Sequence, residues 1–180
     1  MRLDPTFSRP WAALSFTHFQ DAFQHWHDRD AAVEQAYRLA SQALLCDERD
    51  PAAHWAHGRA LWLQGRQAPG LAALDAAVEL SPNFAHGHYG LAFVHAQSGD
   101  AERALVEAER SRELSPFDPL AFGMFGARAM ALMSLQRHDE AAEAALKAAS
   151  RPNAHVHIQG IAMYCLALAG RLSEAQQVAA

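Results

Sequence analysis

The sequence predicts an all-α fold built from a tandem series of helix pairs, and three observations support this. Apolar residues make up 51% of the 180 residues, and charged residues make up 19%. Alanine supplies about a fifth of the chain and favours helices, whereas the β-branched residues that fill sheets are sparse. A segment of about 34 residues recurs, and each copy reads as two helices separated by a turn.

The repeat is clearest in the middle of the chain. HWAHGRALWLQGRQAPGLAALDAAVELSP (54–82) aligns with HYGLAFVHAQSGDAERALVEAERSRELSP (88–116) at an offset of 34 residues. The same offset later matches Glu140-Ala141 with Glu174-Ala175. Each copy predicts a first helix that ends at a glycine or polar turn, then an alanine-rich second helix that ends at Ser-Pro or Asp-Pro. Proline cannot continue the finished helix but suits the start of the next segment.

Taken in order, the helix pairs divide the chain into five expected units. These are residues 6–50, 51–84, 85–118, 119–153 and 154–180. The first unit contains an insertion, roughly FQHWHDRD, between Gln20 and a second helix expected from Ala31 to Cys46. A shorter insertion around SPFDPLAF precedes the fourth unit. Because one pair cannot bury its own apolar faces, the pairs are expected to stack into a single solenoid.

The period and its pattern resemble the tetratricopeptide repeat (TPR), a helix-turn-helix unit of about 34 residues. The matching residues are Gly58, Gly65, Leu74, Ala77 and Pro82 in one unit, and Leu91, Ala92, Gly99, Ala104, Leu114 and Pro116 in the next. The resemblance implies a right-handed superhelix of about four to five repeats that acts as a protein-interaction module. The two insertions resemble those of TPR regions in bacterial multidomain signalling proteins, namely winged-helix transcriptional regulators or class III nucleotide cyclases.

Both ends of the sequence resemble interrupted repeats. Leu3-Asp4-Pro5, with Trp11 after it, resembles the junction that closes one repeat and opens the next. At the other end, residues 172–180 start a second helix without a closing proline. We interpret the chain as a segment of a longer protein; a short protein with degenerate ends is the alternative.

In the TPR family the first helix of each pair lines a concave groove. The resemblance implies that eleven residues of this chain occupy groove-facing positions. They are Phe16, Phe19, Trp55, Arg59, Trp62, His86, Tyr89, Phe93, Met130, Met133 and Tyr164. Trp, Tyr and Arg dominate binding hot spots because they offer large, rigid and partly polar contact area. We therefore predict a groove for a peptide or amphipathic helix, with Arg59 fixing a carboxylate or carbonyl.

Three alternatives stay open for these side chains. They pack between helices as core, or they are buried in a homodimer, or Arg59 and Tyr89 line a pocket for a small molecule. The lysine clamp with which some TPR proteins hold chaperone peptides is not expected, because the only lysine is Lys147.

Catalytic and metal-binding motifs are not evident. The sequence contains no Gly-x-Ser-x-Gly elbow, no phosphate-binding glycine loop and no His-Glu-x-x-His. It contains three His-x-His pairs, at residues 25–27, 86–88 and 155–157, whose rings point apart on a helix. We predict a non-enzymatic protein without cofactor or metal; pH sensing by a histidine cluster stays open.

Charge and hydropathy restrict the partners further. The net charge is -5 and the arginines are scattered, so direct nucleic-acid binding is not expected. The longest apolar run, IAMYCLALAG, is too short to span a bilayer, and no secretory leader precedes the first helix. We therefore expect a cytoplasmic protein with a protein or peptide partner.

Overall fold

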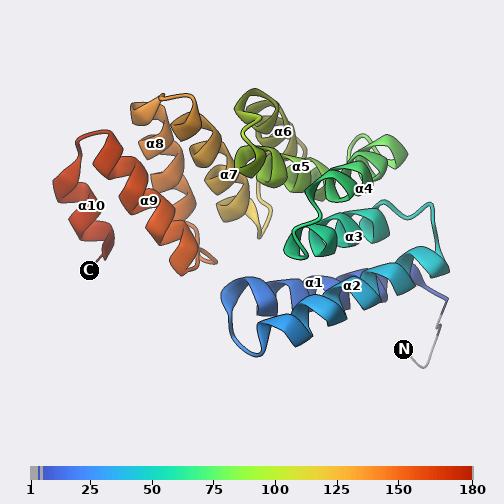
Figure 1. The fold of residues 1–180 in the computed structure, drawn as a ribbon. Helices are drawn as coiled ribbons and strands as arrows, with labels where there is room; N and C mark the ends of the chain where they lie inside the picture. Colours follow the sequence, from blue (N-terminus) through green and yellow to red (C-terminus); the bar gives the residue numbers. More distant parts are fainter. Residues whose placement is uncertain (1–3, 5, 180) are drawn as a thin grey trace. The chain divides into compact units, whose positions relative to one another are not determined.

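The computed structural model describes residues 4 and 6–179, and these residues form ten α-helices and no strand (Figure 1). The helices are α1 (Ser8–Gln24), α2 (Arg29–Cys46), α3 (Pro51–Leu63), α4 (Gln67–Leu80), α5 (Ala85–Ser98), α6 (Ala101–Leu114), α7 (Ala121–Ser134), α8 (His138–Ala149), α9 (Val156–Leu168) and α10 (Leu172–Ala179). The expected all-α class is confirmed. The Leu3-Asp4-Pro5 junction lies largely outside the described residues.

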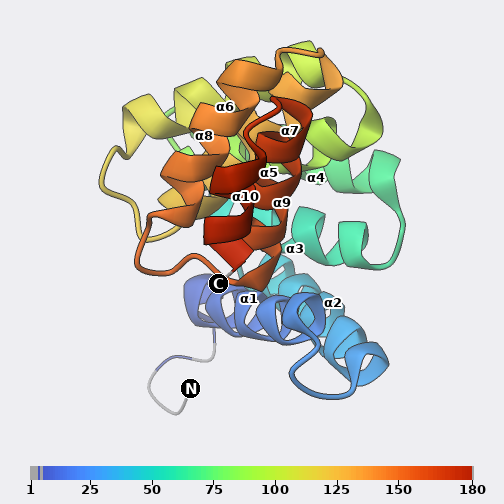
Figure 2. The same cartoon turned by 90° about the vertical axis from the view of Figure 1, so that its left-hand side faces the viewer.

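The chain divides into two compact units, Met1–Gly90 and Leu91–Ala180, with the boundary inside α5. In the first unit α1 lies beside α2, and α3 packs on α1, α2 and α4 (Figure 2). In the second unit α7 packs on α6 and α8, and α9 packs on α7, α8 and α10. The division of the chain into five repeats of one solenoid stays a prediction.

Small residues form much of the core, which lets the helices approach closely. Ala36, Ala40 and Ala43 are fully buried along one side of α2. Where α3 meets α4, a Cβ added to Gly58 would lie 2.8 Å from the carbonyl oxygen of Gly70. Only glycine fits this contact without a backbone shift, which explains why the TPR pattern has a small residue here.

The turns that end the first helices share a left-handed backbone. Gly65, Gly99 and Gly170 have φ angles of 73°, 87° and 73°, Gln136 has a φ of 58° after α7, and His25 has a φ of 55° after α1. Glycine adopts this conformation without a Cβ clash, so three of these five turns carry the residue that the geometry favours.

The first insertion is shorter than the sequence predicted. Helix α1 continues to Gln24, and α2 begins at Arg29 instead of Ala31. The carboxylate of Asp28 caps α2 by accepting a hydrogen bond from the Ala31 N–H at 2.9 Å. The inserted residues therefore lengthen α1 by a turn and supply the cap of α2, which leaves a short loop between them.

Two histidines at equivalent repeat positions make the same hydrogen bond. His54 Nε2 lies 2.8 Å from the carbonyl oxygen of Glu48, and His88 Nε2 lies 3.0 Å from that of Pro82. Each ring bonds the loop that precedes its own helix. The recurrence of His at this position therefore has a structural cause.

Candidate functional site

The predicted binding residues of the first unit form one connected cluster. They come from the first helices of successive pairs: α1, α3 and the beginning of α5. We call this cluster the aromatic row; it consists of Phe16, Phe19, Phe23, Trp55, Arg59, Trp62, Phe84, His86 and Tyr89.

Ring contacts run through the row from one helix to the next. The ring centroids of Phe16 and Trp55 lie 4.8 Å apart, which joins α1 to α3. Trp55 then stacks on His86 at 5.3 Å with an interplanar angle of 25°, which joins α3 to α5. Phe19 and Trp62 lie 6.2 Å apart at the other end of α3. These separations are typical of favourable aromatic pairs.

The Arg59 guanidinium lies inside the row. Its central carbon is 4.0 Å from the ring centroid of Phe19 and 5.2 Å from that of Tyr89. The rings of Phe16 and Trp55 also lie within 6 Å. Burial lowers the pKa of Arg59, and its charge interaction and hydrogen bond with Tyr89 act in the opposite direction. The guanidinium faces are therefore occupied by cation–π contacts.

Burial divides the row into an inner and an outer set. Phe19, Trp55, Arg59 and Tyr89 are between 1% and 6% exposed. The outer set is half-buried and consists of Phe16, Phe23, Trp62, Phe84 and His86. Only the outer set presents surface that a partner could contact.

Sequence reasoning missed two members of the row. Phe23 fell in the expected insertion, and Phe84 was the last residue of the second expected unit (51–84). The spacing of Phe16, Phe19 and Phe23, three and then four residues, places them on one side of a helix and could have found Phe23. Phe84 carries no comparable pattern, because it precedes the helix whose His86 it contacts.

The remaining predicted residues lie in the second unit. Phe93 on α5 is 8% exposed and belongs to the core. Met130 and Met133 on α7 are half-buried. Tyr164 on α9 is 57% exposed and is the most accessible of the eleven predicted residues.

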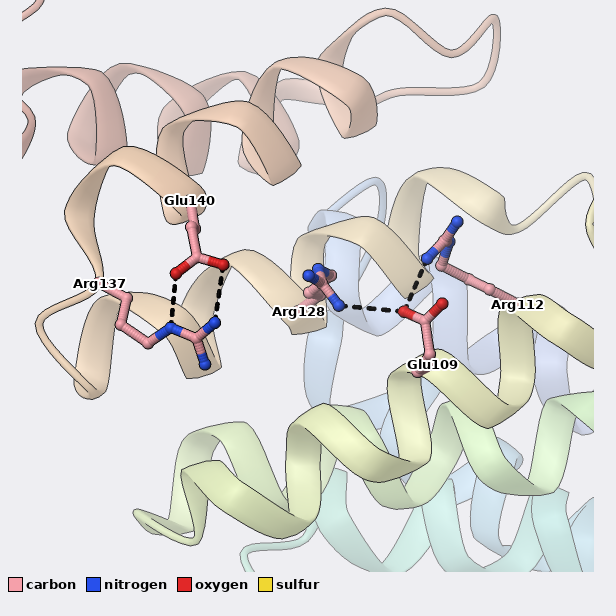
Figure 3. A network of polar contacts seen from close by, with 5 residues as sticks. All are labelled: Glu109, Arg112, Arg128, Arg137 and Glu140. Carbon is pink, nitrogen blue, oxygen red and sulfur yellow. Dashed lines mark hydrogen bonds and ion pairs between the residues drawn. The ribbon is translucent and has the colours of Figure 1, made fainter.

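A polar network joins α6 to α7 in the second unit, and a separate ion pair between Arg137 and Glu140 lies at the start of α8 (Figure 3). One carboxylate oxygen of Glu109 accepts hydrogen bonds from Arg112 at 2.8 Å and from Arg128 at 3.0 Å. The Arg112 guanidinium also lies 4.5 Å from the ring centroid of Phe125. Mixed charges such as these are typical of a solvated helix face. In the structure, part of this charged face of α6 binds α7 through Arg128.

This network borders a cleft of about 360 Å³. Four carboxylates and three cations line it, namely Glu109, Asp139, Glu140, Glu143, Arg112, Arg128 and Lys147. Because the charges nearly balance and several are paired with one another, the cleft favours neither anions nor cations.

No group of three His, Cys, Asp or Glu side chains in residues 4 and 6–179 is arranged to hold a metal ion. No helix in the same residues is long and apolar enough to cross a bilayer.

Solved structures with a similar fold include a TPR protein, although no protein family and no curated protein matches the sequence. TTC0263, a thermophilic TPR protein of Thermus thermophilus, has a TM-score of 0.70 at 18% identity and covers 91% of this chain and 87% of its own. MamA (residue 41 to the end) of Desulfovibrio magneticus RS-1 has a TM-score of 0.64 at 18% identity, with 93% and 90% covered. PilF of Pseudomonas aeruginosa has a TM-score of 0.70 at 13% identity, with 94% and 75% covered. The chain therefore has a TPR-type fold.

Proposed function

We propose that this TPR-type chain is a protein-interaction module that binds a peptide or an amphipathic helix on the outer set of the aromatic row. The observation that carries the proposal is the arrangement of half-buried rings on three helices around a buried arginine. Fold alone does not identify a function, so the proposal rests on these side chains.

The outer rings have the properties of a binding hot spot. Phe16, Trp62 and His86 are each half-buried, and their ring contacts fix their orientation. A partner therefore gains apolar contact without ordering these side chains, which lowers the entropic cost of binding. Aromatic anchors of this kind favour apolar side chains spaced along one face of a short peptide or helix.

For Arg59 we propose a positioning role in place of direct contact with the partner. The Arg59 side chain is only 4% exposed, so it presents little surface to a carboxylate of a partner. It is instead placed to hold the neighbouring aromatic rings in position. We further propose a regulatory role in a bacterial cytoplasmic signalling protein, which rests on the resemblance of the two insertions.

A peptide-display selection with paired variants tests the proposal. Ligands are selected on the wild-type chain from a library of helical and extended peptides, and their Kd values are measured by fluorescence anisotropy. We expect Trp62→Ala and Phe16→Ala to weaken binding by roughly 10-fold or more, as truncation of a hot-spot aromatic does. Trp26→Ala, at a tryptophan that is 67% exposed in the loop after α1, is the matched control and should leave Kd unchanged.

Two outcomes would contradict the proposed site. In one, the selected ligands bind the Trp62 and Phe16 variants as tightly as the wild type. In the other, the Trp26 variant loses as much affinity as the Trp62 variant, which would move the binding surface to the loop between α1 and α2.

A further inference from the structure

The outer set of the aromatic row forms two clusters, one near each end of α3. The Trp62 cluster consists of Phe23 and Trp62, and the Trp55 cluster consists of Phe16, Phe84 and His86 around the inner ring of Trp55. The ring centroids of Phe23 and Trp62 lie 6.1 Å apart, and those of Phe16 and Trp55 lie 4.8 Å apart. Each cluster therefore joins α1 to α3 and offers a partner half-buried rings at its own end of α3.

The two clusters are separated by two helical turns on both helices. Phe16 and Phe23 are seven residues apart on α1, and Trp55 and Trp62 are seven residues apart on α3. Because Phe16 contacts Trp55 and Phe23 contacts Trp62, the two helices run in the same direction. At the helical rise of about 1.5 Å per residue, the clusters stand about 10.5 Å apart along the helix axes.

This separation matches an α-helical ligand better than an extended one. An α-helix places residues i and i+7 on one side, also about 10.5 Å apart. A β-strand repeats each face every two residues, so its same-face side chains stand about 6.7 Å or 13 Å apart. A polyproline II segment repeats every three residues, at about 9.3 Å, which is about 1 Å too short.

The row also has the sequence spacing with which one helix packs on another. Its members on α1 are three and then four residues apart, and its members on α3 are four and then three residues apart. This is the heptad spacing of helix–helix seams, and α1 and α3 present two such seams side by side. A third helix along these seams meets side chains that repeat with its own period.

Positive charge lies between the two clusters. Arg59 is four residues after Trp55 and three before Trp62, and it is the only row member with a permanent charge. No row member and no residue of α3 is Asp or Glu. Asp21, the only acidic residue of α1, has a carboxylate oxygen 2.7 Å from Nδ1 of His27 in the loop after the helix. Because a buried charge is screened less than an exposed one, Arg59 favours a carboxylate on a partner that lies across the space between the clusters.

We propose that the ligand of the aromatic row is an acidic amphipathic helix that lies along α1 and α3. Its apolar residues at i and i+7 contact the Trp55 and Trp62 clusters, and an Asp or Glu at i+3 or i+4 lies between them. Arg59 acts on this carboxylate through space, without leaving its position among the rings. The inference rests on the proposed peptide binding and adds the conformation, the anchor spacing and the charge of the ligand.

Stapled helical peptides that differ only in anchor spacing test the conformation and the register. Each carries two leucines and a glutamate at i+4 on an alanine–glutamine background, and its Kd for the full chain is measured by fluorescence anisotropy. We expect the i, i+7 peptide to bind roughly 10-fold or more tightly than an i, i+5 peptide of the same composition, whose second leucine points to another side of the helix. A polyproline peptide with leucines at i and i+3 should also bind more weakly than the i, i+7 helix.

Protein variants place this preference on the row. Trp62→Ala removes one cluster and should abolish the preference for the i, i+7 peptide. Trp26→Ala, at the exposed tryptophan in the loop after α1, is the matched control and should keep it.

The charge of the middle residue is tested with a double-mutant cycle between peptide and protein. Changing the peptide glutamate to lysine should weaken binding to the wild type roughly 10-fold at low salt, and less at 0.5 M NaCl. In Arg59→Met, which keeps most of the side-chain volume without the charge, the same change should weaken binding by less than about 3-fold. If Arg59 only held the rings in place, its replacement would weaken the glutamate and lysine peptides equally.

Three results would overturn this inference and leave peptide binding in place. They are selected ligands that need Trp62 but bind as extended or proline-rich segments, an i, i+5 peptide that binds as tightly as the i, i+7 peptide, and equal binding of the glutamate and lysine peptides at low salt. A display selection whose ligands are all indifferent to Trp62→Ala would instead overturn the proposed binding site, and this inference with it.

Discussion

Gln136 occupies a backbone conformation that glycine occupies in three equivalent turns. Its φ is 58°, against 73° at Gly65 and 87° at Gly99. A residue with a Cβ is strained in this region, whereas glycine is not. Gln136→Gly should therefore raise the free energy of unfolding by about 0.5–1 kcal/mol, since the relief of strain exceeds the added entropy of the unfolded chain.

Urea denaturation of the wild type and the Gln136 variant measures this change. Gly99→Ala, the reverse substitution at an equivalent turn, should lower stability by about 1 kcal/mol. A Gln136→Gly protein less stable than the wild type would show that the glutamine side chain has a stabilising role that outweighs its backbone strain.

The buried Arg59 allows a second prediction at the level of one residue. Arg59→Ala should lower the free energy of unfolding by about 2–4 kcal/mol, because it leaves a cavity among rings that pack on the guanidinium. Arg59→Met should lose less, since methionine fills much of the volume without burying a charge. Thermal and urea unfolding give the order of stability of the wild type, Arg59→Ala and Arg59→Met. An alanine variant within about 0.5 kcal/mol of the wild type would contradict the positioning role.

The sequence predicted the members of the aromatic row better than their exposure. The repeat register correctly placed Trp55, Arg59 and Tyr89 on first helices, because the register depends only on local periodicity. The burial of Trp55 and Arg59 depends on α1, which packs against α3, and the sequence does not state how closely two helices approach. Tertiary contact therefore made four expected binding residues, Phe19, Trp55, Arg59 and Tyr89, inner members of the row.

Helix boundaries were predicted well where turn residues mark them and poorly where they do not. Pro51 and Gly65 bracket α3 as expected. The end of α1 carries no such residue, and Phe23 stays helical with its ring 6.1 Å from Trp62. Packing therefore extends α1 beyond the point at which the repeat pattern would end it.

Two aspartate caps provide a prediction for whole helices. Asp28 caps α2 from an exposed position, and Asp28→Ala should cost about 1 kcal/mol. Asp50 caps α3, is 5% exposed and also accepts a hydrogen bond from the buried Ser8 hydroxyl at the start of α1. Asp50→Ala should therefore cost about 2–3 kcal/mol, because it removes a cap and leaves a buried hydroxyl without its acceptor.

The free energies of unfolding of the two cap variants are compared under the same conditions. Ser8→Ala combined with Asp50→Ala should recover part of the loss, because the stranded hydroxyl is then absent. If Asp28→Ala and Asp50→Ala lowered the free energy of unfolding equally, that result would contradict a link between α1 and α3 through Asp50.

At the scale of the molecule, the sequence predicted the fold class because the 34-residue period recurs along the chain. The period can be recognised even where the predicted end of a single helix is wrong. Neither the sequence nor the structure names a partner, because TPR-type folds serve many partners through different surface residues.

Stability should fall as the pH drops below about 6.5, the ordinary pKa of histidine. The pKa of His57 is lowered mainly by burial and further by the charges of His54 and Arg66. The pKa of His155 is lowered mainly by burial and further by the charge of His157. Between these lowered values and about 6.5 the unfolded chain binds more protons than the folded chain, so stability rises with pH. Urea unfolding across this range measures the slope. The double variant His57→Gln and His155→Gln should flatten it, and an unchanged slope would contradict the assignment.

The indole region of the ¹H–¹⁵N NMR spectrum tests the proposed binding surface most directly. The four tryptophans, Trp11, Trp26, Trp55 and Trp62, give four indole signals that single substitutions can assign. On titration with a selected peptide, we expect the Trp62 signal to shift most, the Trp55 signal to follow through its contacts with Phe16 and His86, and the Trp26 signal to stay in place. A titration that moves Trp26 or Trp11 and leaves Trp62 and Trp55 unchanged would contradict binding at the aromatic row.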